Sequence, residues 1–308
     1  MASINDLATA ASAVSALAPP PYTTSSTASS GPSPAAAGEV PSSGAAVVRG
    51  ALVVLEGLDR SGKTTQVKLL EQRFVELGRR VKVMRFPDRT TPIGQMIDGY
   101  LKSQVEMDDH AIHLLFTTNR WEAAKTIVAL LNSGVTVVCD RYYHSGIVYS
   151  AAKQNPALSL TWARAPEIGL PRPDLVLFLD LDEAQARGRG GWGGEVYEKG
   201  EMQRRVRELF WGLSMGKINT VPVSVAGSAA GGGPSAPAAG EAAVAVGPPT
   251  PETLTGTEQL FRQEEEDLYV IDASPSVEEV AEEVWRVVKI RVEAVENGEV
   301  GNIVRRVS

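Results

Sequence analysis

Residues that could bind a phosphate chain follow one aliphatic stretch of the sequence. Segment 57–64 reads GLDRSGKT and fits the pattern G-x-x-x-x-G-K-[ST]. Glycines let the backbone curl, so that several N–H groups point at phosphate oxygens. Lys63 supplies a positive charge for the β- and γ-phosphates, and the Thr64 hydroxyl is a suitable ligand for Mg²⁺. The segment therefore predicts a site for a nucleoside triphosphate with magnesium.

The residues on either side of this loop predict the strand and the helix that it needs. The aliphatic run 52–55 is typical of a buried parallel strand. Val67, Leu70 and Phe74 then have the spacing of one helix face. A helix beginning near Gly62 would add the positive end of its dipole to the phosphate site. The alternative is a strand-to-helix turn that binds nothing, and this context argues against it.

Four further aliphatic runs predict the rest of a sheet. They cover 81–86, 135–139, 175–179 and 268–272. Helix-like spacing separates them, at 93–101, 108–132, 145–165 with a break at Pro156, 202–213 and 277–295. This alternation indicates an α/β fold with a five-stranded parallel sheet and helices on both faces. Ligands bind at the carboxyl ends of such strands, so the loop at 57–64, Arg89 and Asp140 should converge there.

Composition separates folded from low-complexity parts of the 308-residue chain. Residues 1–46 and 220–256 are rich in Ala, Gly, Pro and Ser, and we expect both segments to be disordered. A strand-like run returns after the second segment, so we interpret it as an insertion into one domain. We expect that domain to cover 47–295, with a C-terminal tail at 296–308.

Net charge and cysteine content limit the cellular compartment and the binding partners that we expect for this chain. The net charge of −7 argues against a nucleic-acid binder, and the single cysteine, Cys139, excludes an intrachain disulfide. No apolar run approaches the ~18 residues of a membrane span. The first Lys or Arg is Arg49, which argues against a signal or transit peptide. We expect a cytoplasmic or nuclear protein with neither nucleic acid nor membrane as a partner.

Residues after the other strands narrow the class of phosphate-loop protein. The sequence has no Asn-Lys-x-Asp guanine reader, which argues against a GTPase. Asp140 follows a strand and suits Mg²⁺, with Asp180 at another strand end as a rival. Arg141, Arg89 and Arg120 suit a second phosphorylated molecule. These residues favour transfer between two phosphorylated molecules over hydrolysis.

Six segments in a fixed order carry the most specific pattern. They are 56–65 (EGLDRSGKTT), 85–89 (RFPDR), 113–121 (HLLFTTNRW), 140–142 (DRY), 169–180 (GLPRPDLVLFLD) and Tyr197 with Glu198 in the Gly-rich stretch 184–200. Together they resemble the thymidylate kinase family in its eukaryotic form. The resemblance implies a P-loop nucleoside monophosphate kinase fold and transfer of phosphate from Mg-ATP to dTMP, in dTTP synthesis. It also implies a homodimer and a lid at about 184–200.

The resemblance further implies a role for each matching residue. The ATP site would comprise Gly57, Leu58, Asp59, Arg60, Ser61, Gly62, Lys63, Thr64 and Thr65, with Thr64 and Asp140 holding the metal. Catalysis would rest on Arg60, Lys63, Asp140 and Arg141. The dTMP site would comprise Asp59, Phe86, Arg89, Phe116, Asn119, Arg120, Arg141, Tyr142 and Tyr149.

Within the dTMP site the resemblance implies specific contacts. Asp59 would accept a hydrogen bond from the sugar 3′-hydroxyl, and Arg89 and Arg141 would bind the acceptor phosphate. Phe116 would stack on thymine, although it also fits the apolar stripe of its helix. Arg120, assisted by Asn119, would donate to a base carbonyl. Three aromatic residues would shape the pocket: Tyr149 would lie against the deoxyribose, Phe86 would form a wall and Tyr142 would help to shape the floor.

The lid departs from the family pattern. Val196 precedes Tyr197 and Glu198, where we expect a basic residue, while Arg187 and Arg189 lie earlier and are either lid cations or solvated charges. Two alternatives stay open. One is a kinase for another monophosphate, such as UMP or dUMP, which the pocket at Phe116, Arg120 and Tyr149 would distinguish. The other is a regulatory nucleotide-binding protein that binds ATP without turnover.

Overall fold

The computed structural model describes residues 48–188, 195–198, 200–215 and 268–308. They belong to one unit, Ala45–Ser308. The segments 1–46 and 220–256, for which we predicted disorder, lie outside the described residues, as does part of the predicted lid. Among the helices in the described ranges, none is long and apolar enough to cross a bilayer.

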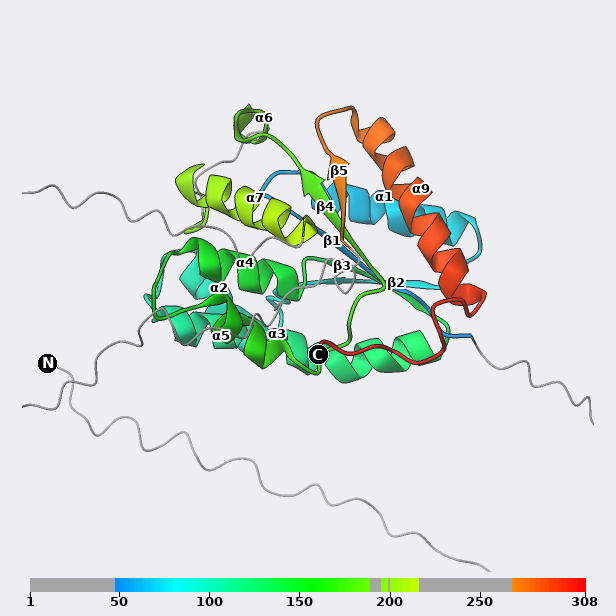
Figure 1. Cartoon of the computed structure of the whole chain (residues 1–308), viewed down its shortest axis with the longest axis horizontal. Helices are drawn as coiled ribbons and strands as arrows, with labels where there is room; N and C mark the ends of the chain where they lie inside the picture. The colour runs from blue at the N-terminus through cyan, green and yellow to red at the C-terminus, as the bar shows by residue number, and fades with distance from the viewer. Residues whose placement is uncertain (1–47, 189–194, 199, 216–267) are drawn as a thin grey trace, which may run out of the picture. The chain divides into compact units, whose positions relative to one another are not determined.

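A five-stranded parallel sheet forms the centre of the fold, as the sequence predicted (Figure 1). The strands are β1 (Leu52–Gly57), β2 (Val81–Arg85), β3 (Thr136–Asp140), β4 (Leu175–Asp180) and β5 (Leu268–Asp272), in the order β2-β3-β1-β4-β5. β1 is central and buried along its length because β3 and β4 pair with its two edges. The register sets Leu55 beside Asp140, so the ends of β1 and β3 lie side by side.

Helices cover both faces of this sheet. On one face lie α1 (Lys63–Glu76) and α9 (Val277–Glu296), whose buried side chains pack against β1, β4 and β5. On the other face lie α3 (Asp109–Asn132), α4 (Tyr143–Ala152) and α7 (Gly200–Ser214). The remaining elements are α2 (Pro92–Leu101), α5 (Leu160–Arg164), the 3₁₀ helix η2 (Ala165–Glu167) and α6 (Glu183–Gly188). The predicted break near Pro156 separates α4 from α5.

Two helix starts show how local sequence sets the elements that carry the site. Asp108 caps α3, accepting hydrogen bonds from the backbone nitrogens of His110 (2.9 Å) and Ala111 (3.4 Å). α9 begins with a capping box in which Ser276 and Glu279 exchange side-chain-to-backbone hydrogen bonds. These caps satisfy N–H groups that a helix start leaves without partners.

The C-terminal residues correct the predicted domain boundary at 295. Val307 is buried in the main core, and its backbone N–H and carbonyl bond to Leu170 and Gly169 at 2.9 and 2.8 Å. Arg305 O accepts a further bond from Arg172 N at 2.9 Å. Segment 296–308 is therefore part of the domain and not a tail. The sequence missed this because the apolar residues Val300, Ile303, Val304 and Val307 have helix-like spacing, yet the segment forms no helix and only Val307 among them is fully buried.

Candidate active site

One cavity of about 770 Å³ opens at the carboxyl ends of β1, β2 and β3. Most of the predicted site residues line it: Asp59, Arg60, Ser61, Gly62, Lys63, Thr64, Thr65, Phe86, Arg89, Phe116, Arg120, Asp140, Arg141, Tyr142, Tyr149, Tyr197 and Glu198. Gly57, Leu58 and Asn119 are not among the described residues of the lining. Parallel strands bring these distant segments together, as expected.

The phosphate loop has the backbone geometry that its glycines allow. Gly57 has a φ of 151°, and a Cβ there would lie 2.7 Å from Leu179 O and from Ser61 Oγ. Gly62, at φ 93°, precedes the first residue of α1. A side chain at either position would be strained, and at Gly57 it would also clash. The loop is therefore held in a curled form beside the start of α1.

Lys63 is folded back over this loop. Its ammonium group donates to the carbonyl of Leu58 and lies 3.3 Å from Ser61 Oγ. Burial and the nearby Arg141 cation together lower the pKa of Lys63 to about 7, against the opposing effect of Asp59. A bound phosphate chain would place negative charge beside this buried amine.

Two oxygen ligands for a divalent ion lie side by side at the loop. Thr64 Oγ1 donates to Asp140 Oδ2 at 2.7 Å. The rival Asp180 is instead paired with Arg207, through bonds of 2.6 and 2.8 Å. The geometry therefore favours Asp140. Within the described residues no group of three or more Asp, Glu, His or Cys side chains is placed to hold a metal ion.

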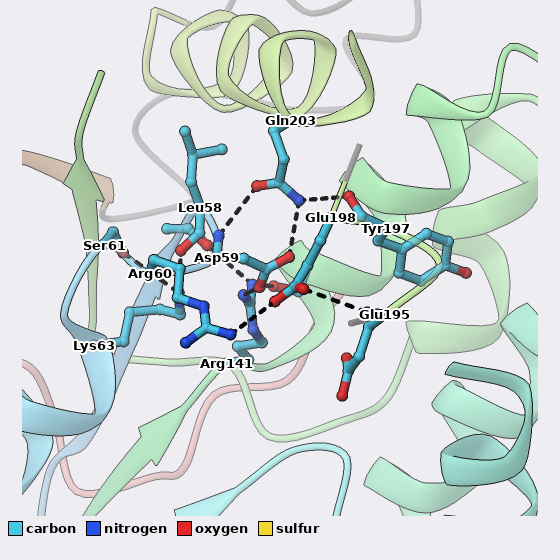
Figure 2. Close-up of polar contacts among 12 residues, drawn as sticks. Leu58, Asp59, Arg60, Ser61, Lys63, Arg141, Glu195, Tyr197, Glu198 and Gln203 are labelled. Carbon is cyan, nitrogen blue, oxygen red and sulfur yellow. Dashed lines mark hydrogen bonds and ion pairs between the residues drawn. The ribbon is translucent and has the colours of Figure 1, made fainter. Parts of the chain in front are cut away.

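Asp59 is the centre of a buried polar network (Figure 2). It pairs with Arg141 and also accepts from Gln203 Nε2 at 2.8 Å and from the Tyr149 hydroxyl at 3.4 Å. Burial by itself would raise the pKa of Asp59. The cations Arg141 and Lys63 and these hydrogen bonds outweigh burial and hold it below its usual value. Asp59 is therefore a fixed, ionised hydrogen-bond acceptor.

Two arginines of the site have left-handed backbones. Arg60 has φ 69° and Arg141 has φ 68°, a conformation that costs a non-glycine residue free energy. Arg141 is held there by bonds to Gly57 O (2.9 Å) and Ser145 Oγ (3.0 Å). Such strain at two cations facing one cavity is typical of a functional site.

Arg89 also lines the cavity and lies between two carboxylates. It bonds to Asp98 at 2.6 Å and to Glu195, beside the predicted lid residues, at 2.8 Å. Asn119 was predicted to assist at the base. That role stays a prediction; in the structure its amide holds the 88–91 loop, accepting from Asp88 N at 2.7 Å and donating to Thr91 Oγ1 at 3.1 Å. Asn119 thus supports the segment that carries Arg89.

The predicted base pocket combines aromatic rings with a buried ion pair. Phe86 packs on Tyr142, with ring centroids 5.5 Å apart, and the Tyr142 side chain is itself buried. Arg120 Nε donates to Glu167 Oε2 at 3.0 Å, and both side chains are almost fully buried. Phe116 is half-buried and packs with the α2–α3 cluster while lining the cavity. It therefore serves both the packing and the pocket.

The described part of the lid closes over the phosphate loop. Glu198 approaches Arg60 at 3.4 Å, and Tyr197 stands against Tyr149 with ring centroids 5.4 Å apart. Val196, which replaces the expected basic residue, packs against the α2–α3 cluster and bonds through its N–H to Leu101 O at 3.0 Å.

The structure describes only one of the two arginines predicted as lid cations. Arg187 belongs to the backbone of α6, Glu183–Gly188, and Arg189 lies outside the described residues.

Sequence reasoning missed several residues of the site. Gln203 and Glu167 are buried partners of Asp59 and Arg120, and no motif marked either of them. A second wall of the cavity comes from the β5–α9 connection, formed by Ala273, Pro275, Ser276 and Val277. The position of this connection after a strand was the one available signal, because strand ends share an edge of the sheet.

The fold and the site define a class. A parallel α/β sheet carries a phosphate loop, a Thr–Asp pair suited to Mg²⁺ and a set of arginines facing an aromatic pocket across one cavity. These are the features of a P-loop nucleoside monophosphate kinase.

Comparison with known proteins identifies the family within this class. The family model described as thymidylate kinase matches residues 55–226. Thymidylate kinases from Schizosaccharomyces pombe and Homo sapiens are 51% and 48% identical over 162 residues, which is 53% of this chain and 76% of each relative. A solved thymidylate kinase structure from Candida albicans superposes with a TM-score of 0.61 at 28% identity, covering 84% of this chain and 99% of that one. The chain belongs to the thymidylate kinase family.

Proposed function

We propose that this chain uses Mg-ATP to phosphorylate dTMP, giving ADP and dTDP on the route to dTTP. Its family membership supports the reaction. The observation that carries it is the shared cavity, where the phosphate loop faces Arg89 and Arg141 beside the pocket of Phe86 and Phe116. The γ-phosphoryl group passes directly to a phosphate oxygen of dTMP. Positioning and charge neutralisation do most of the catalysis, without a covalent intermediate.

The residues present fit a magnesium ion at the phosphate loop. Thr64 and Asp140 would hold it, because hydroxyl and carboxylate oxygens are its preferred ligands and these two lie 2.7 Å apart. A bound Mg²⁺ would neutralise charge on the phosphate oxygens. The chain itself would contribute Lys63 at the β- and γ-phosphates and Arg60 at the transferred group.

The arginine contacts support a model in which substrate phosphates replace carboxylates. Arg60 faces Glu198 at 3.4 Å and Arg89 faces Glu195 at 2.8 Å. Arginine binds carboxylates and phosphates through the same fork of N–H groups. We infer that dTMP and ATP take over these N–H groups, which leaves the lid carboxylates to rearrange as the site fills.

Transfer of a labelled γ-phosphate tests the proposed reaction. The wild-type protein should move label from ATP into dTDP, and Lys63→Met should lower kcat by about 10²–10³-fold because one stabilising charge is lost. ATP binding without labelled dTDP in the wild type would contradict the proposal and favour the regulatory alternative.

A matched pair of variants tests the assignment of Asp140 as a magnesium ligand. Asp140→Asn should raise the Mg²⁺ concentration needed for half-maximal activity by about tenfold or more, because one oxygen charge near the metal is lost. Asp180→Asn removes the same charge at a strand end that pairs with Arg207. An equal shift in both variants would overturn the assignment to Asp140.

We also propose a homodimer through the outer face of α2 and α3. Met96 on α2, Leu114 and Trp121 on α3, and Ile168 after η2 are each at least 40% exposed, although all four are large and apolar. The Trp121 indole donates to Pro166 O at 2.9 Å, which joins α3 to the segment that carries Ile168. Exposed apolar side chains grouped in this way are typical of an interface.

Sedimentation velocity tests this dimer. Leu114→Glu should convert it to monomer, because the interface would have to bury a charge. Leu77→Glu is the control, since Leu77 is 55% exposed at the end of α1 on the other face of the sheet. Dimers that persist in the Leu114 variant would contradict this interface.

A further inference from the structure

Gln203 occupies an unusual place beside the site. It lies on α7, its side chain is fully buried, and it is not among the described residues that line the cavity. Its Oε1 accepts from Asp59 N at 3.1 Å. Its Nε2 donates to Asp59 Oδ2 and to Tyr197 O, both at 2.8 Å (Figure 2). One amide thus joins α7, the phosphate loop and the lid.

The hydrogen bonds fix the orientation of this amide. Its oxygen faces an N–H group and its nitrogen faces two oxygens, so both amide N–H groups and one oxygen lone pair have partners. An inverted amide would place N–H against N–H and oxygen against oxygen. A buried amide with all these partners is rigid, because breaking any bond leaves a buried polar atom unpaired.

Gln203 binds Asp59 at two points, and this determines where the Asp59 carboxylate points. The backbone contact fixes the residue within the loop, and the side-chain contact fixes the rotation of its carboxylate. Arg141 and the Tyr149 hydroxyl occupy the remaining directions around that carboxylate. Asp59 therefore depends on a residue 144 positions away in the sequence for its geometry.

The third bond makes this geometry depend on the lid. Tyr197 O accepts from the same Nε2 that donates to Asp59, and the next residue, Glu198, faces Arg60 of the phosphate loop. If Tyr197 moves away, the amide keeps its two bonds to Asp59 but loses the acceptor that holds its other N–H, so its orientation toward Asp59 is less firmly fixed. The position of the lid and the orientation of Asp59 are thus linked through one side chain.

We propose that Gln203 is a positioning residue through which the lid controls recognition of the acceptor's 3′-hydroxyl. Gln203 aims the Asp59 carboxylate at that hydroxyl, and it does so when Tyr197 is in place. The inference rests on the proposed function, in which Asp59 accepts a hydrogen bond from the sugar of dTMP. Gln203 on α7 would thus contribute to substrate specificity through Asp59, without itself contacting the substrate.

Two acceptors that differ only at the 3′-position test this role. The assay compares kcat/KM for dTMP and for its 3′-deoxy analogue in the wild type, in Gln203→Met and in Gln203→Glu. The wild type should prefer dTMP, and both variants should lose about tenfold or more of that preference, the size expected for one hydrogen bond to a charged group. KM for ATP should change by less than the preference does, because Lys63 and Thr64 are untouched. Gln72→Glu on the exposed face of α1 is the matched control and should keep the full preference.

The Gln203→Glu variant adds a readout that a purely structural role would not change. When protonated, the introduced carboxyl offers an O–H where the amide offered an N–H. It faces the carboxylate of Asp59, so its pKa should be raised. The charged and titratable groups of this network are Asp59, Arg60, Lys63, Arg141, Tyr149 and Glu198. Activity on dTMP relative to the wild type should therefore rise from about pH 8 to about pH 6, whereas Gln203→Met should show no rise.

If the Gln203 variants fold poorly, hydrogen exchange on the wild-type protein tests the proposal instead. Binding of dTMP should slow exchange at Asp59 and at the start of α7 more than binding of the 3′-deoxy analogue does. Equal protection by both ligands, or folded variants that keep the wild-type preference, would overturn the inference. A wild-type protein that leaves dTMP unphosphorylated would instead refute the proposed function.

Discussion

Substitutions in the buried Arg120–Glu167 ion pair can separate its effect on folding stability from its effect on recognition of the base. Arg120→Met should lower the free energy of unfolding by about 3–5 kcal/mol, because it leaves the carboxylate of Glu167 buried without a cation. The double variant Arg120→Met with Glu167→Met should recover most of that stability, since no buried charge remains. Neither should prefer dTMP, because the guanidinium is absent from both. Urea denaturation and acceptor kinetics measure the two effects, and a double variant as unstable as the single one would contradict this account.

His113 should make stability depend on pH. It is almost fully buried beside Ser150. Burial and the Arg120 cation, against the opposing effect of Glu167, lower the pKa of His113 to about 4. The unfolded chain then binds a proton below about pH 6.5 that the folded chain does not accept until about pH 4. Folding stability therefore falls as the pH is lowered through this window.

The variant His113→Asn isolates this contribution from that of other groups. When the pH is lowered from about 8 to about 5, the wild type should lose about 2 kcal/mol more of its free energy of unfolding than the variant does. Chemical denaturation at both pH values measures it. A difference that does not change with pH would show that His113 titrates normally.

At the scale of elements, the C-terminal segment offers a matched pair of substitutions. Val307 is 3% exposed in the main core and Ile303 is 83% exposed. Val307→Ala should reduce the free energy of unfolding by about 1–3 kcal/mol, from lost burial and a cavity. Ile303→Ala should leave it nearly unchanged. Equal effects in thermal or urea unfolding would mean that the segment does not pack as the structure shows.

The sequence predicted elements well where patterns are local. The start of α3 at Asp109 follows from the capping side chain of Asp108, and β1 follows from its aliphatic run. It did not reveal the contacts of residues that act through a distant partner. Asn119 matched a family motif, yet its amide holds Asp88 and Thr91, 31 and 28 positions away. Local spacing contains no information about such contacts.

At the scale of the whole molecule, topology explains why the site could be located before its contacts were known. Parallel strands end on one side, so residues after β1, β2 and β3 had to meet there. Topology alone does not determine which side chains pair. The bonds from Gln203 to Asp59 and from Arg120 to Glu167 span 144 and 47 positions. They depend on how α7 and η2 pack, which the strand pattern does not determine.

The most direct test of the central claim is an acceptor panel in a coupled ADP-release assay with Mg-ATP. The panel contains dTMP, dUMP, UMP, dCMP, AMP and GMP. The cavity, with Tyr149 beside Asp59 and with Phe116 and Arg120 on the base side, predicts that dTMP is the preferred acceptor and exceeds UMP by about tenfold or more. Preference for a ribonucleotide, or ATP binding with no turnover of any acceptor, would contradict the account.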